Sequence, residues 1–165
     1  MIRAVLPVAF CVLGASLASQ TLNLPSVTSN GKAPSYSCDN IPSDQSSCVR
    51  VLACVGDEGV YFDGAARGWD TGTVTGFMSD GTDCTGTWTS GGMGGTGLSS
   101  LTCDGDLTAD VIYYSQDNDT GTVIGRGRDS LGRSLKVWSG LNVLAYLSES
   151  GEPALPCTTG SIPIS

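Results

Sequence analysis

The sequence of 165 residues contains no histidine. Histidine is the side chain that most often moves protons near neutral pH, and it is the commonest metal ligand in proteins. Its absence excludes Ser-His and Cys-His nucleophile systems. Because no positioned partner can be named for any acidic side chain either, we expect a protein that is not an enzyme and that uses no cofactor or metal.

Positive charge is also scarce. Eight Lys and Arg residues stand against sixteen Asp and Glu residues, which gives a formal net charge of −8. Such an acidic surface repels phosphate-rich polymers and anionic headgroups. The composition therefore predicts no nucleic-acid partner and leaves an unknown protein or carbohydrate as the expected partner.

Long apolar runs are absent after the N-terminus, and no later stretch approaches the roughly 20 residues that a membrane helix needs. Residues 1–18 have one cation, Arg3, followed by an apolar run with a small-x-small ending, which indicates a signal peptide. We expect an exported protein, periplasmic or secreted, with no integral membrane segment after signal removal, and the compact signal favours a bacterial source. The alternative is a lipid anchor on Cys11, although Phe10 stands where a lipoprotein signal requires a small residue.

The sequence has no Cys-x-x-Cys pair, which, without histidine, disfavours a tetrahedral zinc site. Removal of Cys11 with the signal leaves an even number of cysteines, and in an exported chain this indicates disulfides. Cys84 and Cys103 flank one Gly-rich loop, whose closure is worth roughly 3 kcal/mol in the chain-entropy model. Sequence alone does not fix the connectivity; the pairs that we favour are Cys84–Cys103, then Cys38–Cys48 and Cys54–Cys157.

No window shows an apolar stripe at helical spacing, whereas 23 glycines separate many short segments rich in β-branched residues. This pattern predicts an all-β fold: an antiparallel meander of about eight short strands that forms a small barrel or a sandwich, stapled by disulfides. The run 140–147 is interpreted as a last strand, with a short helix as the alternative. The expected core anchors are Trp69, Trp88 and Trp138.

Composition also suggests the domain organisation. After the signal, residues 19–35 are rich in Ser, Asn, Thr and Pro, which predicts a flexible N-terminal segment. Residues 36–157 are expected to form a single β domain, and residues 158–165 a C-terminal tail.

The β domain contains an internal repeat of about fifty residues. The segment Asp-Thr-Gly-Thr-Val at 70–74 recurs at 119–123. A hairpin turn, a strand with an inward glycine, a second turn and a Trp-bearing strand would account for each copy. At the same offset, Gly76 matches Gly125 and Asp80 matches Asp129. After one inserted residue in the second copy, Trp88 matches Trp138.

The duplicated Asp-Thr-Gly has a second interpretation, because paired loops of this kind supply the two carboxylates of an aspartic hydrolase. Asp70 and Asp119 would be that pair. The residues before each copy are mostly polar, however, and about fifty residues cannot build the lobe that each loop needs. Asp-Thr-Gly is also an ordinary turn in which Asp caps its own backbone and Gly adopts a positive φ. We interpret the motif as a chain reversal and keep the hydrolase as a remote alternative.

Residues 80–97, DGTDCTGTWTSGGMGGTG, resemble a MORN repeat. That family's pattern has Asp-Gly, then an aromatic residue, Gly and Trp at alternate positions, then spaced glycines. Cys84 replaces the aromatic residue here. The resemblance implies a β-hairpin with the tryptophan packed against glycines of the next strand, and family members mostly serve as scaffolds or binding surfaces. The matching positions are Asp80, Gly81, Gly86, Trp88, Gly91, Gly95 and Gly97.

Two other motifs are interpreted as turns. Gly92-x-Gly94-x-x-Gly97 matches a dinucleotide fingerprint as a string, but a strand should follow it where that motif requires a helix. Residues 117–121 resemble the start of a calcium loop, yet Gly121 and Arg128 stand where an EF-hand requires ligands. We expect solvated turn acids there, with weak calcium binding as the alternative.

Four cations fall within eleven residues: Arg126, Arg128, Arg133 and Lys136. In a hairpin, Arg126 and Arg128 point to one face, whereas the spacing of Arg133 and Lys136 puts those two on opposite faces. At most three of the four therefore share a face. Such a cluster could bind a carboxylate, a phosphate or an acidic partner protein. The alternative is that these residues pair with cross-strand acids and keep the hairpin soluble.

These observations predict an exported, non-enzymatic β domain that acts as a binding or structural module. The alternative function is a secreted inhibitor of a hydrolase such as lysozyme or a protease. A rigid loop suits that task because it loses little entropy on binding. The Gly-rich loop at 90–99 or the basic hairpin would be the inserted element.

Overall fold

The computed structural model describes residues 38–148 and 151–164, which belong to one unit of the chain, Ala33–Ser165. The predicted signal peptide at 1–18 and the predicted flexible segment at 19–35 lie outside the described residues. Among the residues described, no helix has the length and apolar character needed to cross a membrane.

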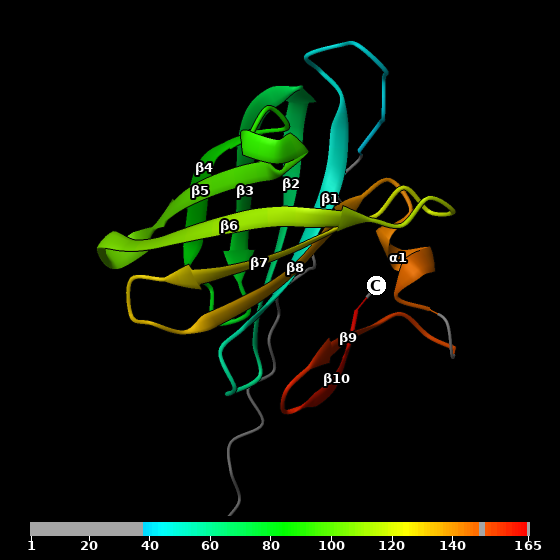
Figure 1. The fold of residues 1–165 in the computed structure, drawn as a ribbon. Helices are drawn as coiled ribbons and strands as arrows, with labels where there is room; N and C mark the ends of the chain where they lie inside the picture. The colour runs from blue at the N-terminus through cyan, green and yellow to red at the C-terminus, as the bar shows by residue number, and fades with distance from the viewer. Residues whose placement is uncertain (1–37, 149–150, 165) are drawn as a thin grey trace, which may run out of the picture. The chain divides into compact units, whose positions relative to one another are not determined.

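Eight antiparallel strands follow one another and close into a barrel (Figure 1). Each strand pairs with the next along the chain, and the eighth returns to pair with the first, with Leu52 opposite Trp138 and Val55 opposite Leu135. The predicted all-β meander of about eight strands is confirmed, and it forms the barrel of the two predicted alternatives. The strands are β1 (Cys48–Val55), β2 (Val60–Trp69), β3 (Thr71–Met78), β4 (Asp83–Thr89), β5 (Gly97–Cys103), β6 (Leu107–Gln116), β7 (Val123–Asp129) and β8 (Ser134–Gly140).

Side chains at alternate strand positions point into the barrel, as the pleat of a strand requires. In β1, Val51 and Ala53 point inward, whereas Leu52 and Cys54 point outward and are also buried. Burial on both faces explains the nearly continuous apolar sequence of this strand. The interior core consists of Val51, Ala53, Val55, Phe62, Ala66, Val74, Met78, Cys84, Cys103, Ala109, Val111, Leu135 and Val137.

A C-terminal segment covers the outer face of the β1–β8 pair. It comprises α1 (Val143–Tyr146) and a hairpin of β9 (Ala154–Cys157) and β10 (Gly160–Pro163). Its apolar side chains form a second cluster with Leu52 and Trp138, which are almost completely buried. The seam of the barrel therefore lies between two apolar layers.

The run 140–147 is not the strand that we expected. Strand β8 ends at Gly140 and the helical turn α1 follows, so the helix alternative is correct. The physical reason is that β8 already pairs with β7 on one side and β1 on the other, which leaves no free edge for a further strand. Val143 instead packs into the outer cluster. The segment 158–165, predicted to be a tail, contains β10, which pairs with β9.

The three tryptophans predicted as core anchors occupy different environments. Trp138 is buried outside the barrel, under the C-terminal segment, and Trp88 packs against the interior core. Trp69 is not a core anchor, because it is the last residue of β2, on the outward-pointing register, and is 37% exposed.

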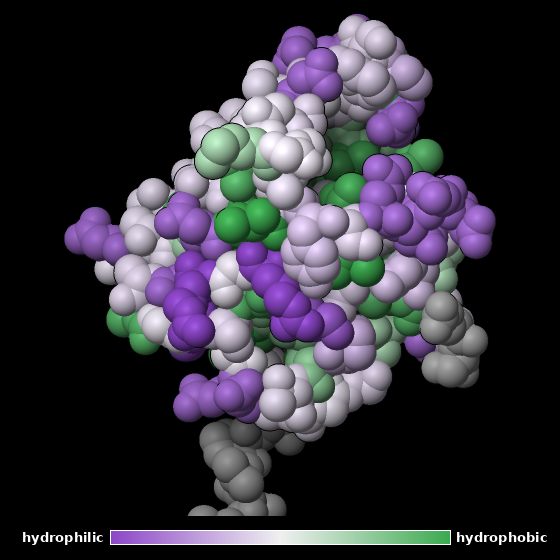
Figure 2. Space-filling model, viewed as in Figure 1, coloured by the Kyte–Doolittle hydropathy of each residue, from purple (hydrophilic) through white to green (hydrophobic). Residues whose placement is uncertain are grey.

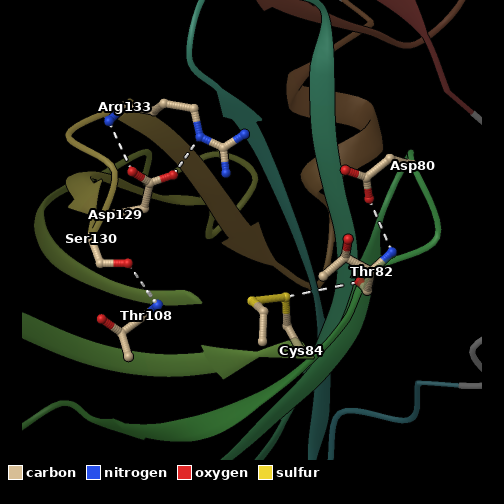
Figure 3. The surroundings of a disulfide bond; sticks show 8 residues. Asp80, Thr82, Cys84, Thr108, Asp129, Ser130 and Arg133 are labelled. Atoms are coloured by element: carbon tan, nitrogen blue, oxygen red, sulfur yellow. Dashed lines mark hydrogen bonds and ion pairs between the residues drawn. A yellow bond between two sulfur atoms is a disulfide. The ribbon is translucent and has the colours of Figure 1, made fainter. Parts of the chain in front are cut away.

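Three disulfides cross-link the fold, and they are the pairs favoured from the sequence. Cys84–Cys103 joins directly opposed residues of β4 and β5 inside the barrel, and Figure 3 shows its surroundings. Cys54–Cys157 ties β1 to β9, which fastens the C-terminal segment to the barrel wall. Cys38–Cys48 ties the residues before β1 to its first residue.

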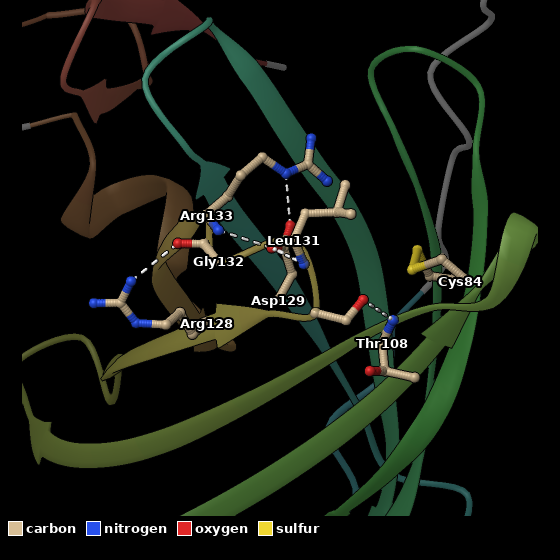
Figure 4. Close-up of polar contacts among 9 residues, drawn as sticks. Cys84, Thr108, Arg128, Asp129, Leu131, Gly132 and Arg133 are labelled. Atoms are coloured by element: carbon tan, nitrogen blue, oxygen red, sulfur yellow. Dashed lines mark hydrogen bonds and ion pairs between the residues drawn. A yellow bond between two sulfur atoms is a disulfide. The ribbon is translucent and has the colours of Figure 1, made fainter.

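We call one end of the barrel the closed end because inward side chains fill the interior toward it, and carboxylates hold its turns. Asp129, at the end of β7, accepts hydrogen bonds from the Leu131 and Arg133 backbone N–H groups and from Arg133 Nε at 2.6 Å (Figure 4). Asp80 accepts from the Thr82 backbone N–H at 3.0 Å, and hydrogen bonding to Thr82 lowers the pKa of Asp80 (Figure 3). Towards this end, the interior retains a cavity of only about 40 Å³.

Replacing both Cys54 and Cys157 with Ser should lower the free energy of unfolding more than replacing both Cys38 and Cys48. The first disulfide spans 103 residues and the second spans 10. The chain-entropy model gives about 4.7 kcal/mol and roughly 3 kcal/mol for loops of these lengths. Urea unfolding followed by circular dichroism measures both losses. A larger loss for the Cys38–Cys48 variant would contradict the stabilising role of the C-terminal attachment.

Candidate functional site

The opposite end of the barrel is open and contains a cavity of about 400 Å³. The start of β1, the β2–β3, β4–β5 and β6–β7 connections and the end of β8 surround it. Figure 2 shows apolar residues in the hollow between the β4–β5 and β6–β7 connections. We call this cavity the mouth of the barrel. An eight-stranded barrel is wide enough to hold one small ligand in a cavity of this kind.

Four lining residues come from four sides of the ring: Trp88 from β4, Tyr113 from β6, Ser139 from β8 and Ala66 from β2. Strands four places apart in a closed ring of eight lie on opposite sides. Trp88 therefore faces the strand of Ser139, and Tyr113 faces the strand of Ala66. Two aromatic walls opposite two small residues leave a space suited to a flat ring.

The indole of Trp88 is held in place by its own N–H, which donates to the Arg67 carbonyl oxygen at 3.1 Å. Gly72, paired with Trp88 across β3 and β4, makes room for the ring, because a Cβ there would lie 2.7 Å from the indole nitrogen and overlap the Arg67 oxygen. Trp88 thus packs against a glycine of the preceding strand. Since its donor is already used, Trp88 offers the cavity an apolar surface.

Tyr113 separates the mouth from the interior of the barrel, since its side chain borders both cavities. Its hydroxyl lies 3.4 Å from the Ser99 hydroxyl. Burial raises the pKa of Tyr113, an effect that the hydrogen bond with Ser99 partly opposes. Tyr113 is therefore a neutral phenol at physiological pH and forms the part of the cavity wall that borders the barrel interior.

Ser139 is the polar group most deeply placed in the wall of the mouth. It follows Leu135 and Val137 on the inward-pointing register of β8 and is only 6% exposed. Within the described part of the chain, the Ser139 hydroxyl has no hydrogen-bond partner. Every side-chain oxygen there that is fully enclosed does have a partner, so the Ser139 hydroxyl is not fully enclosed. It is reached from the cavity that Ser139 lines.

None of the described residues that line the cavity carries a charged side chain. Moving an ion into an apolar site without a partner is costly. The cavity is therefore suited to an uncharged molecule. Its other polar side chains stand at strand ends near the rim: Thr89, Ser90, Ser115 and Gln116.

The cations predicted to bind an anion or partner lie on the β7–β8 hairpin, outside the barrel. Arg126 and Lys136 are cross-strand partners, and Arg128 follows on the same face of β7, so three cations share a face as expected. Lys136 lies 4.8 Å from the centre of the Trp138 ring, where it makes a cation–π contact. In Figure 2, hydrophilic residues extend over the face formed by β6 and β7.

The turn of this hairpin uses two of the same cations for its own structure. Arg133 forms an ion pair with the fully buried Asp129 carboxylate, and Arg128 donates to the Gly132 carbonyl oxygen at 3.0 Å (Figure 4). Arg133 thus pairs with an acid of the same turn, whereas Arg128 bonds to a backbone carbonyl and not to a cross-strand acid. None of the four basic residues lines the cavity.

The two aspartates of the remote hydrolase alternative lie at the open end but on opposite sides of it. Asp70 forms the β2–β3 turn with φ of 61°, and Asp119 lies in the β6–β7 connection, four strands away round the ring. Asp70 Oδ1 accepts from the Ser90 hydroxyl at 3.3 Å. An aspartic dyad shares one proton between adjacent carboxylates, and this placement keeps the two carboxylates apart.

The other motifs form turns. The Gly-rich segment contains the short helical turn Met93–Gly95 and leads into β5, so a strand follows it as predicted. In the β6–β7 connection, Asp117 Oδ1 accepts from the Thr120 hydroxyl at 2.6 Å and its backbone N–H at 2.8 Å, and both bonds lower the pKa of Asp117. Across residues 38–148 and 151–164, no three His, Cys, Asp or Glu side chains are grouped as a metal site.

Ser139 and Tyr113 were not singled out as site residues from the sequence. A signal for Ser139 is present, because a polar residue follows two apolar residues at spacing two in Leu135, Val137 and Ser139. Tyr113 and Tyr114 are adjacent, and only the register of β6 decides that Tyr113 points inward while Tyr114 is 55% exposed.

Comparison with known proteins identifies no family. No protein-family model and no curated protein matches the sequence. Solved structures similar to this chain include the redesigned β-barrel mFAP1 bound to DFHBI, at 20% identity and a TM-score of 0.45, covering 58% of this chain and 94% of that chain. A de novo designed fluorescence-activating β-barrel is 14% identical with a TM-score of 0.46, covering 61% of this chain and 98% of that chain.

Gly72→Ala should destabilise the protein by about 2 kcal/mol or more, because the added methyl group overlaps the Arg67 oxygen and the Trp88 indole. Gly91→Ala is the matched control, since a Cβ there meets its nearest atom at 3.6 Å and the residue has no positive φ. Urea unfolding compares the two. Equal stability of both variants would show that Trp88 does not need the space above Gly72.

Tyr113 should ionise above the ordinary pKa of a tyrosine, as a late step in an alkaline titration followed by ultraviolet absorbance. Because burial raises its pKa in the folded state, the contribution of the neutral phenol to stability is complete below about pH 10 and is lost as the pH rises further. Tyr113→Phe should remove the late step, and Tyr114→Phe should leave it in place. A late step that survives in Tyr113→Phe would contradict this assignment.

Proposed function

We propose that this protein is an exported, non-enzymatic binding module that holds one small, mostly apolar molecule in the open end of its barrel. The observation that carries the proposal is the cavity of about 400 Å³, with Trp88 and Tyr113 in its walls and no charged side chain among the described lining residues. Small-molecule sites are typically concave and largely apolar with a few placed polar groups.

Export is supported by the predicted signal peptide and by the three disulfides, which persist in oxidising compartments. The same cross-links favour binding, because a closed ring of hydrogen-bonded strands tied by Cys84–Cys103 is already ordered before a ligand arrives. Preorganised walls reduce the entropy lost on binding.

Binding without turnover is supported by the chemistry of the lining. Tyr113 is the titratable side chain among the described lining residues that faces the interior, and burial raises its pKa, which keeps it protonated. The opposed positions of Asp70 and Asp119 do not favour an acid–base pair. These features favour a receptor for a small molecule over a hydrolase.

Inhibition of a hydrolase is the second candidate function, and one observation favours it. Met93, at the tip of the Gly-rich loop, is 95% exposed, while the paired strands β4 and β5 hold both ends of that loop. A stable complex with lysozyme or a protease in gel filtration would support this candidate, which requires no ligand in the mouth.

The proposal predicts saturable binding of the uncharged fluorescent probe N-phenyl-1-naphthylamine, with about one probe bound per chain. Ala66→Phe should fill the mouth and weaken binding by about tenfold or more, a difference of about 1.4 kcal/mol. Thr73→Phe is the control, because it adds the same ring at an exposed position on the neighbouring strand.

Fluorescence titration gives both affinities, and thermal unfolding with near-ultraviolet circular dichroism checks that each variant is folded. A wild-type protein that does not saturate would overturn the proposal. So would a folded Ala66→Phe variant that binds the probe as well as Thr73→Phe does.

A further inference from the structure

We infer that the molecule held in the mouth is uncharged and ring-shaped and carries one hydrogen-bonding group that pairs with the hydroxyl of Ser139. This inference rests on the proposed function and specifies its ligand. Three independent features of the cavity lead to it: an unpartnered hydroxyl, the placement of the aromatic walls and the absence of charge among the described lining residues.

The hydroxyl of Ser139 is the feature that points to a polar group on the ligand. Side-chain oxygens that are as buried as this one usually have a hydrogen-bond partner, and Ser139 is 6% exposed with none among the described residues. The neighbouring inward positions of β8, Leu135 and Val137, are apolar. A serine at the third position therefore presents a hydroxyl to the cavity where an apolar residue would continue the core.

The aromatic walls define the shape of the ligand. Trp88 presents its ring with the indole N–H already bonded to Arg67, so it contributes no polar contact of its own. Tyr113 is the second aromatic wall, next to the barrel interior, and its hydroxyl is close to Ser99. A ring that meets an aromatic wall edge to face gains binding energy beyond its buried area. Because β4 and β8 are opposite, a ring whose near edge meets Trp88 directs its far edge toward Ser139.

The charges of the protein exclude an ionic ligand. No cation lines the mouth to pair with an anion, and no carboxylate lines it to pair with a cation, in the part of the wall that is described. The arginines of the β7–β8 hairpin lie outside the barrel, where Arg133 pairs with Asp129 and Arg128 with Gly132. An ion in the mouth would thus lose its hydration without gaining a partner.

The test compares three bicyclic probes of similar size on the oxidised full-length mature chain: 2-naphthol, naphthalene and 2-naphthoate at neutral pH. We expect 2-naphthol to bind about five- to tenfold more tightly than naphthalene, which is the typical effect of one hydrogen bond. We expect 2-naphthoate to bind at least about tenfold more weakly than naphthalene. Ser139→Ala should make 2-naphthol and naphthalene equal and leave naphthalene binding unchanged.

Ser134→Ala is the matched control, because it removes a hydroxyl from an exposed position on the same strand at the closed end. It should leave all three affinities unchanged. If none of the three probes binds, the proposed function fails and this inference fails with it. If naphthalene binds but 2-naphthol gains nothing, or if the gain survives in Ser139→Ala, the inference fails while the proposed function stands. Tight binding of 2-naphthoate would overturn the exclusion of charge.

Discussion

Pairing between β1 and β8 is the interaction on which the remaining structure depends. It satisfies the backbone groups of both terminal strands, so the sheet has no exposed edge. It also fixes which residues of each strand point inward, because a slip of one residue would exchange the two faces. The outer residues of the same pair, Leu52 and Trp138, provide the apolar surface on which the C-terminal segment packs. Cys54–Cys157 then holds that segment in place.

The two ends of the barrel differ because of the size of the side chains that point inward. Toward the closed end, Phe62, Met78 and the Cys84–Cys103 disulfide fill the interior and leave little free volume. Toward the open end, Ala66 and Ser139 take inward positions, and the cavity remains. The cavity thus results from the size of the inward side chains on the strands. Regular backbone hydrogen bonds position the residues that line it.

Much of the fold could be predicted because its signals are local. Short β-branched segments, glycine-rich turns and an even number of cysteines each act over a few residues. Closure into a barrel, the helical turn after Gly140 and the site itself depend on long-range register. Trp88 and Trp138 illustrate the limit: the sequence aligns them after one inserted residue, yet that single residue puts Trp88 inside the barrel and Trp138 outside it. The face of a strand alternates with every residue, so one inserted residue is enough to exchange the two faces.

The seam between β1 and β8 also determines the order in which this chain can fold. Arg50 pairs with Gly140, so the first strand cannot gain its second neighbour until nearly the whole domain is available. Contacts so distant in sequence slow the folding of β proteins. During that interval β1 presents an unpaired edge and two apolar faces, which makes early intermediates prone to aggregation.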